Sequence, residues 1–200
     1  MNKSSFHLSP THLISQYLDG YFPMADENGK IIWHNPPHRA VFDISNYKPK
    51  KSLRTLLNSG DYVVKINENF KAVINECSKL RNPFDEQWLS QELISAYIGL
   101  HVEGLAHSVE VYKNKTLRGG LYGVQIGGVF FGESMFSKES NASKIAFHHL
   151  MLILRKNNFI LLDSQYLNPH TSMLGAFEIP KAQYLKTLKI AVQQNRNFNP

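Results

Sequence analysis

Cysteine is nearly absent from this 200-residue sequence, in which Cys77 is the only one. A single thiol cannot form an intrachain disulfide, so the fold is not a disulfide scaffold, and a reducing cytoplasm is the expected location. The first residues, MNKSSFHLSPTHL, lack the uninterrupted apolar segment of a secretory signal. Both absences argue against secretion.

Long apolar runs are also missing. No stretch approaches the roughly 20 apolar residues that a membrane-spanning helix needs. The two longest, near 145–154 and 159–162, are broken by His148, His149 and Arg155. Hydrophobic residues still make up 42% of the chain and charged residues 19%, which is an ordinary globular composition. We therefore expect a sizeable core and no membrane segment. The protein is expected to be a monomer.

Known metal and triad patterns are absent too. The sequence has no HExxH and no CxxC, and His148 and His149 are adjacent on an expected helix, where they cannot easily share a ligand face. A triad of Ser108, His107 and Glu110 fails because neighbouring residues of a strand point to opposite faces. We expect no metal site.

Positive charge is in excess, with a formal net charge of +6 and a sequence pI of about 9.3. Such a balance favours polyanionic partners such as nucleic acid. The basic residues form three groups: Lys48, Lys50, Lys51 and Arg54; Lys113, Lys115 and Arg118; and Lys181, Lys186 and Lys189. These groups are either a phosphate-binding surface or ordinary solvated charges.

The N-terminal part predicts a small domain at 1–61. Residues 8–19 predict a short helix with Ser9 as its N-cap. The proline-containing stretch 21–42 predicts irregular backbone with short extended pieces, and 50–58 predicts another brief helix.

Residues 62–200 predict a second, larger domain. Apolar periodicity, caps and turn signals indicate the following elements: a strand at 62–66, helices at 70–78 and 90–103, three strands at 107–113, 118–127 and 129–136, a helix at 141–155 that Asn141 caps, a strand at 159–165 and a helix beyond Pro180. This order describes an α/β fold of the α+β type, a mixed sheet flanked by helices, as in acetyl-CoA-dependent N-acetyltransferases.

Three polar residues in this domain are candidates for chemistry. Asp163 and Gln165 are two apart, so on a strand they face the same side and could act together as a catalytic pair. The alternative is that Asp163 caps a loop and Gln165 bonds to backbone. Glu133 stands where a predicted strand leaves the sheet, among aromatic residues that either line an apolar pocket or belong to the core.

The residues just before the predicted helix at 141–155 indicate whether coenzyme A could be the acyl donor. An acetyl-CoA enzyme of this architecture needs a glycine-rich turn there to present amides to the pyrophosphate. Residues 134–144, SMFSKESNASK, contain no glycine. The sequence therefore argues against coenzyme A as the donor.

Several longer motifs, in this order, are highly specific: GYFPM and WHNPPHRAVF (20–42), AYIGLHVEGLAHSVEVY (96–112), GGLYGVQIG (119–127), GESMFSKESNASK (132–144) and LLDSQYLNPHTSMLGAFEIPKAQY (161–184). Together they resemble the bacterial leucyl/phenylalanyl-tRNA–protein transferases over about 13–188. Departures are His34, where a second tryptophan is common, and Ser164, where cysteine is frequent. A leader of some thirty residues with a GGDL-like segment, found in many members of the family, is not seen before GYFPM.

The resemblance implies transfer of Leu or Phe, and sometimes Met, from aminoacyl-tRNA to proteins that begin with Arg or Lys. The product carries an N-terminus that marks it for regulated proteolysis. The family has a small N-terminal domain and an acetyltransferase-like domain, and it uses neither coenzyme A nor a metal.

The resemblance also implies site residues. Asp163 and Gln165 match the family's catalytic pair, and Glu133 matches its third important polar residue. The predicted substrate-binding residues are Trp88, Leu121, Phe130 and Leu150, which match positions that line the family's pocket for the amino acid and terminal adenosine, together with Tyr97 and Leu162.

The mechanism that we expect uses Asp163 to accept a hydrogen bond from the acceptor amine, raising its nucleophilicity or taking its proton. Gln165 positions the amine or the tetrahedral intermediate, and Glu133 holds the acceptor's cationic side chain or supports this network. Two rival interpretations are an acetyl-CoA-dependent N-acetyltransferase and a non-enzymatic RNA-binding module.

Overall fold

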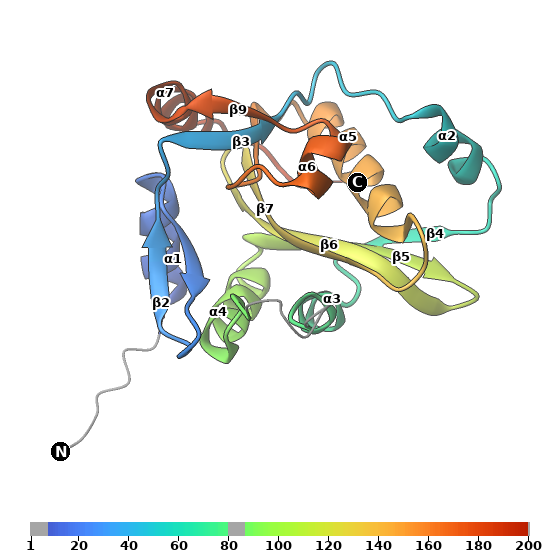
Figure 1. Cartoon of the computed structure of the whole chain (residues 1–200), viewed down its shortest axis with the longest axis horizontal. Helices are drawn as coiled ribbons and strands as arrows, with labels where there is room; N and C mark the ends of the chain where they lie inside the picture. Colours follow the sequence, from blue (N-terminus) through green and yellow to red (C-terminus); the bar gives the residue numbers. More distant parts are fainter. Residues whose placement is uncertain (1–7, 80–86, 200) are drawn as a thin grey trace.

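A mixed sheet of seven strands runs through the molecule in the order β4-β5-β6-β7-β8-β3-β9 (Figure 1). The structure, a computed structural model, describes residues 8–79 and 87–199. The strands are β3 (His38–Phe42), β4 (Val63–Ile66), β5 (Ala106–Lys113), β6 (Thr116–Ile126), β7 (Val129–Ser137), β8 (Leu161–Asp163) and β9 (Phe177–Pro180). Within the described residues, β7 and β8 are the only parallel neighbours in this sheet. The predicted α/β class is confirmed.

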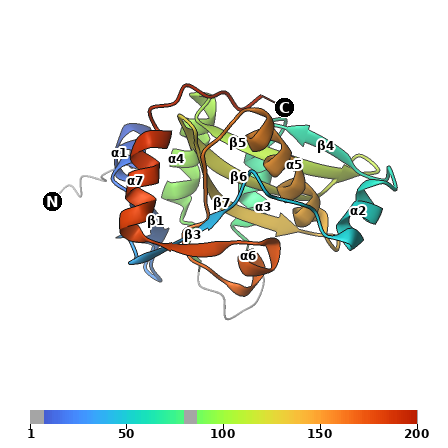
Figure 2. The same ribbon diagram turned by 90° about the horizontal axis from the view of Figure 1, so that it is seen from above.

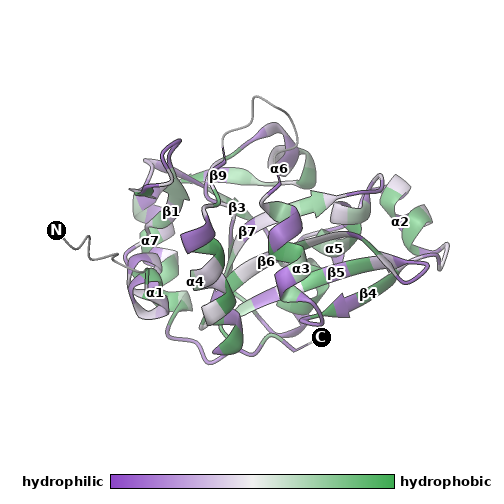
Figure 3. Cartoon of the chain, turned by 90° about the horizontal axis from the view of Figure 1, so that it is seen from below, coloured by the Kyte–Doolittle hydropathy of each residue, from purple (hydrophilic) through white to green (hydrophobic). Residues whose placement is uncertain are grey.

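Helices and hydrophobic cores lie on both faces of this sheet. One core includes residues of α1 (Pro10–Leu18), α3 (Phe70–Cys77), α4 (Gln91–Val102) and α7 (Lys181–Ala191). A second core, on the other face, includes residues of α2 (Lys51–Leu57) and α5 (Ala142–Lys156), while α6 (Pro169–Leu174) lies at its edge. Figure 2 shows α5 and α2 from above, and Figure 3 shows hydrophobic segments on α3 and α4 and on the strands behind them.

The N-terminal part forms a small unit that leads into the main sheet. Next to α1, β1 (Phe22–Ala25) and β2 (Ile31–His34) pair as a separate two-stranded sheet. The chain then enters the large sheet as β3, which lies between β8 and β9. The large sheet therefore includes residues 38–42 of the predicted domain 1–61. The prolines at 36–37 led to a prediction of irregular backbone, but the residues that follow them form a strand that is buried from Arg39 to Phe42.

The predicted N-cap of α1 is confirmed, because the side chain of Ser9 accepts a hydrogen bond from the backbone N–H of His12. Ser90, which was not predicted as a cap, accepts in the same way from Leu93 at the start of α4. The predicted cap of α5 is wrong, because Asn141 has a left-handed backbone with φ of 66° and its side chain makes no cap bond. The hydroxyl of Ser137 instead accepts from the backbone N–H of Ser143 at 3.0 Å.

Two elements near the C-terminus were not predicted. Residues 169–174 form α6, whose N-terminus has a capping box between Asn168 and Thr171 with Pro169 in the first turn. Residues 177–180 form β9, which pairs with β3. Among all described residues, no helix combines the length and the apolarity that crossing a bilayer requires.

A bulge in β7 shapes the middle of the sheet. Tyr122 of β6 pairs with Ser134, and the next residue, Gly123, pairs with Gly132. Glu133 is therefore the extra residue on β7, and a bulge of this kind re-aims the side chain that it carries. The prediction that the strand leaves the sheet at Glu133 is wrong, because β7 continues to Ser137.

Gly123→Ala should lower the free energy of unfolding by about 3 kcal/mol, the upper part of the usual cost of overpacking. A Cβ at Gly123 would overlap the carbonyl oxygen of Phe131 and the ring of Phe130. Gly132→Ala is the matched control on the paired strand, because its Cβ would meet the carbonyl oxygen of Asp163 at an ordinary 3.4 Å. Urea unfolding of both variants checks this expectation, and equal stabilities would contradict it.

Candidate active site

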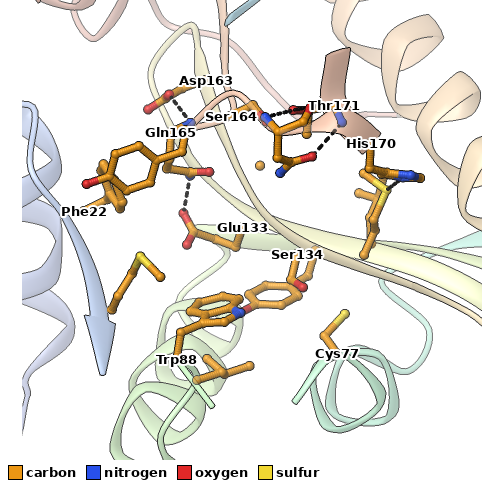
Figure 4. Close-up of a pocket in the computed structure, with 18 of the residues that line it drawn as sticks. Phe22, Cys77, Trp88, Glu133, Ser134, Asp163, Ser164, Gln165, His170 and Thr171 are labelled. Atoms are coloured by element: carbon orange, nitrogen blue, oxygen red, sulfur yellow. Dashed lines mark hydrogen bonds between the residues drawn. The ribbon is translucent and has the colours of Figure 1, made fainter. Parts of the chain in front are cut away.

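A large pocket opens where β7 and β8 stop pairing. Their last paired residues are Phe131 and Asp163, after which β7 continues along β6 while β8 ends. The pocket has a cavity volume of about 950 Å³. Its apolar walls include Phe42, Trp88, Leu121, Phe147, Leu150 and Leu162. Its polar residues include Asn168 and, as Figure 4 shows, Glu133, Ser134, Asp163, Gln165 and His170.

Asp163 is one of the residues that line the pocket, and its side chain is fully buried. Its Oδ1 accepts from Nε of Arg39 and from the backbone N–H of Gln165, both at 2.9 Å. Its Oδ2 accepts from Nη2 of Arg39 at 2.7 Å and from the hydroxyl of Tyr184 at 2.9 Å. A carboxylate offers about four lone-pair sites, so all of them are occupied. The Asp163 carboxylate has no site left for a substrate.

Arg39 is the buried partner of Asp163, with 1% of its side chain exposed. Its guanidinium lies 4.4 Å from the ring centre of Phe22 and 4.6 Å from that of Tyr184. Its Nη1 donates to the carbonyl of Gly20 at 3.1 Å. Burial alone lowers the pKa of Arg39, but the adjacent Asp163 carboxylate outweighs burial and raises it. The guanidinium is therefore a permanent cation that neutralises Asp163.

The spacing of Asp163 and Gln165 predicted that both side chains lie on one face of a strand, and this prediction is wrong. β8 ends at Asp163, and Gln165 has a left-handed backbone with φ of 55°. The bond from its backbone N–H to Asp163 stabilises this turn, so the predicted capping alternative is realised for Asp163. The Gln165 carboxamide still faces the pocket, where its Nε2 donates to Oε1 of Glu133 at 3.3 Å (Figure 4).

Glu133 faces Gln165 across the pocket from the bulge in β7 (Figure 4). Its Oε1 accepts from the hydroxyl of Tyr17 at 2.7 Å, and its Oε2 from the hydroxyl of Tyr97 at 2.8 Å. The pKa of Glu133 is raised to about 7, because burial and the nearby Asp163, which raise it, outweigh the two phenol hydrogen bonds and Arg39, which lower it. This carboxyl group therefore changes protonation near neutral pH.

The predicted substrate-binding residues fall into two groups. Trp88, Leu121, Leu150 and Leu162 line the pocket. Tyr97 and Phe130 do not line it. Tyr97 reaches the site through its bond to Glu133, and Phe130 is buried in the core, where it stacks on Phe198.

Three contributing residues were not singled out in the sequence. Arg39 follows Pro36–Pro37 inside an otherwise apolar strand, and this charge within HRAVF was the available signal. The sequence signal for Tyr17 and Tyr184 was weaker: a tyrosine that is buried usually needs a hydrogen-bond partner for its hydroxyl. None of the three has a short-range motif that identifies its partner.

Metal and triad chemistry find no support in the part of the chain that the structure describes. No group of three or more potential ligands is found there. The ring of His107 contacts Asn67 and stacks on Phe198, while Ser108 donates to Glu110 at 2.6 Å. His107 therefore points away from the other two members of the rejected triad.

A large pocket with apolar walls, and with a carboxyl group and a carboxamide where two strands part, is the candidate active site of an enzyme. The chain belongs to the leucyl/phenylalanyl-tRNA protein transferase family, whose model matches residues 41–189. The model of that family's N-terminal domain matches residues 6–37.

Relatives of similar length support this assignment. The chain is 43% identical over 192 residues to the leucyl/phenylalanyl-tRNA–protein transferase of Prosthecochloris aestuarii, covering 96% of this chain and 99% of the relative. It is 45% identical over 187 residues to the transferase of Chlorobaculum parvum, covering 93% of this chain and 96% of that relative. It is 43% identical over 192 residues to that of Rubrobacter xylanophilus, covering 96% and 98%.

Arg39→Met should lower the free energy of unfolding by about 3–5 kcal/mol, because it leaves the Asp163 charge buried without a counter-ion. Combining Arg39→Met with Asp163→Asn removes both charges and should recover most of this loss. Urea denaturation of the wild type and the variants checks the expectation. A loss below about 1 kcal/mol for Arg39→Met, typical of an exposed pair, would contradict it.

Proposed function

We propose that this protein transfers Leu or Phe, and to a lesser extent Met, from aminoacyl-tRNA to proteins that begin with Arg or Lys. The product would then be recognised for N-degron proteolysis. Membership of the family and the similar names of relatives at 43–45% identity support the activity. The single structural observation that carries it is the pocket in which apolar walls meet Glu133 and Gln165.

The enzyme mainly has to orient the aminoacyl ester and the acceptor amine relative to each other. The donor ester is already activated, and alignment of two reactants can contribute roughly 7–11 kcal/mol. The amino-acid side chain occupies the apolar part of the pocket near Leu121, Leu150 and Leu162. Its ester carbonyl then lies toward Gln165, where the acceptor amine approaches. A protein α-amine has a pKa near 8, so part of it is neutral at cellular pH.

Asp163 acts in this proposal as a positioning residue. Its four lone-pair sites are taken by Arg39, Tyr184 and the backbone of Gln165. It therefore holds Gln165 in its left-handed turn and directs the carboxamide toward Glu133. This replaces the expectation from sequence that Asp163 contacts the amine directly.

The tRNA is proposed to bind through phosphate contacts with exposed basic residues. Lys113 and Arg118 are partly neutralised by Glu139, at 2.9 and 3.7 Å. The other two basic groups, on and before α2 and on α7, therefore contribute more to the attraction than the β5–β6 hairpin does. We also propose that the protein acts as a cytoplasmic monomer and that the reaction uses neither coenzyme A nor a metal.

The rival N-acetyltransferase activity is less well supported. The junction between β7 and α5, where an acetyl-CoA enzyme presents amides to pyrophosphate, has no glycine. The first-turn N–H of Ser143 is already bonded to the Ser137 hydroxyl. An RNA-binding module without activity would leave the Glu133 and Gln165 pair unexplained.

Radiolabelled Leu on tRNA, mixed with the protein and a peptide that begins with Arg, tests the proposal directly. We expect labelled peptide, and little or none with a peptide that begins with Ala. Acetyl transfer from acetyl-CoA without leucyl transfer would favour the rival enzyme. RNA binding without transfer of either group would favour the binding module.

Gln165→Ala should reduce the transfer rate by about 10²–10³-fold, the usual cost of losing one positioned donor in an active site. Gln183→Ala, an exposed glutamine on α7, is the control and should retain the wild-type rate. Single-turnover transfer with saturating enzyme measures both. A wild-type rate for Gln165→Ala would exclude its role.

Affinity for tRNA should fall steeply as salt rises, because each neutralised phosphate releases a counter-ion. Replacing Lys50, Lys51 and Arg54 by Gln should flatten the dependence of log Kd on log salt by about two to three units. The control is Lys113→Gln with Arg118→Gln, which should flatten it less because Glu139 already neutralises these side chains. Filter binding over a salt series measures the slopes, and a flat response of the wild type would contradict phosphate binding.

A further inference from the structure

Three side chains form a closed ring of oxygen contacts at the edge of the pocket. The hydroxyls of Tyr17 and Tyr97 contact Oε1 and Oε2 of Glu133 at 2.7 and 2.8 Å. The two hydroxyls also contact each other at 2.9 Å. Both tyrosine side chains are fully buried. The ring joins α1, α4 and β7, so the N-terminal helix contributes directly to the site.

The number of protons in the ring changes with the state of Glu133. When the carboxyl group is ionised, the two phenols supply two protons for three contacts. Both protons go to the carboxylate, and the contact between the phenols carries none. When Glu133 is protonated, three protons fill the three contacts head to tail. The ring therefore accommodates both states with the same positions of its oxygen atoms.

Burial raises the pKa of Tyr17 and of Tyr97 well above the ordinary value, and the Glu133 carboxylate raises both further. Both phenols therefore stay protonated at neutral pH and act as donors. Glu133 is the member of the ring that titrates in this range, with a pKa of about 7. A proton that enters the ring is therefore held by the carboxyl group.

Glu133 also has room for a substrate, unlike Asp163. It accepts from Tyr17, Tyr97 and Gln165, which leaves one of about four lone-pair sites on Oε2. The bond from Gln165 is long, at 3.3 Å. An amine in the pocket can use the open site or replace the Gln165 contact.

We propose that Glu133 is the group that takes the proton from the acceptor amine, and that Tyr17 and Tyr97 are the positioning residues that hold it for this step. The inference rests on the proposed aminoacyl transfer. The amine nitrogen forms a bond to the ester carbonyl carbon, and its proton passes to Glu133. The bond from that carbon to the ribose oxygen then breaks, and Glu133 returns the proton to this oxygen. The carboxylate is regenerated, so no further reactant is required.

Other charged and titratable groups face this ring from the neighbouring strands. Asp163 on β8 raises the pKa of Glu133, and Arg39 on β3 lowers it. Since these two side chains form an ion pair, their effects oppose each other. Tyr122 on β6 is also buried near Glu133, with its pKa raised mainly by burial, so it stays neutral. The two phenol hydrogen bonds are therefore the main contacts that keep the pKa of Glu133 from rising further.

Tyr17→Phe and Tyr97→Phe test the proposal, because each removes one donor to the carboxylate and opens the ring. The titration of the Glu133 carboxyl group is followed by carbon-13 NMR of glutamate-labelled protein, with Glu133→Gln to assign the resonance. We expect a midpoint of about 7 in the wild type. The loss of a charge-assisted hydrogen bond should move it upward by about one pH unit in each variant.

Transfer rates should follow the same shift. At pH 7 each Tyr→Phe variant should transfer Leu about fivefold more slowly, because its ionised fraction falls from roughly one half to one tenth. At pH 9 the rates should converge on that of the wild type. Tyr122→Phe is the matched control, since among the described residues its buried hydroxyl has no hydrogen-bond partner. In the Tyr122→Phe variant, the titration midpoint of Glu133 should equal that of the wild type.

Three outcomes would overturn the inference: a wild-type midpoint near the ordinary value of 4.5, a midpoint that does not move in the two variants, or transfer rates reduced by the same factor at every pH. The last would indicate that the phenols only support the structure. A wild type that transfers no Leu at any pH would instead refute the proposed function itself, whatever the NMR titration shows.

Discussion

The buried ion pair between Arg39 and Asp163 fixes the rest of the site. It joins β3 to β8 across 124 residues of sequence, and Arg39 also binds the carbonyl of Gly20 just after α1. Tyr184 of α7 donates to the same carboxylate. A fully buried pair is stable only when hydrogen bonds satisfy its remaining lone pairs and protons. Meeting that requirement brings four distant segments together and sets the turn at Gln165.

The two carboxyl groups of the pocket have different environments and therefore different tasks. Asp163 is neutralised by a permanent cation and has no free lone pair. Glu133 is held by neutral phenols, keeps one lone pair and titrates near neutral pH. Pairs of acidic groups whose environments separate their properties are common in active sites, where one orients and the other exchanges protons. The bulge in β7 makes this division possible, because it turns Glu133 toward α1 and α4.

Local signals in the sequence were enough to predict the mixed sheet, most helices and the segments that meet at the pocket. Capping residues and apolar periodicity report on a few neighbouring residues, and they were enough to predict α1 from its Ser9 cap and α4 from its apolar positions. The missed features depend on distant contacts. The strand at Arg39 is stabilised by β8 and β9, the bulge at Glu133 by its register with β6, and the turn at Gln165 by the Asp163 carboxylate. No short motif encodes such pairings, so the sequence named residues that line the pocket but not the contacts that hold them there.

The division of labour between the carboxyl groups is tested most directly by one rate: single-turnover leucyl transfer by a variant in which Arg39→Gln and Asp163→Asn replace the ion pair with two hydrogen-bonding amides. If Asp163 only positions Gln165, this folded variant should retain transfer within about tenfold of the wild type, equivalent to about 1.4 kcal/mol. A loss of about 10²–10⁴-fold, the usual contribution of a general base, would show that the Asp163 carboxylate itself takes part in proton transfer and would contradict the account.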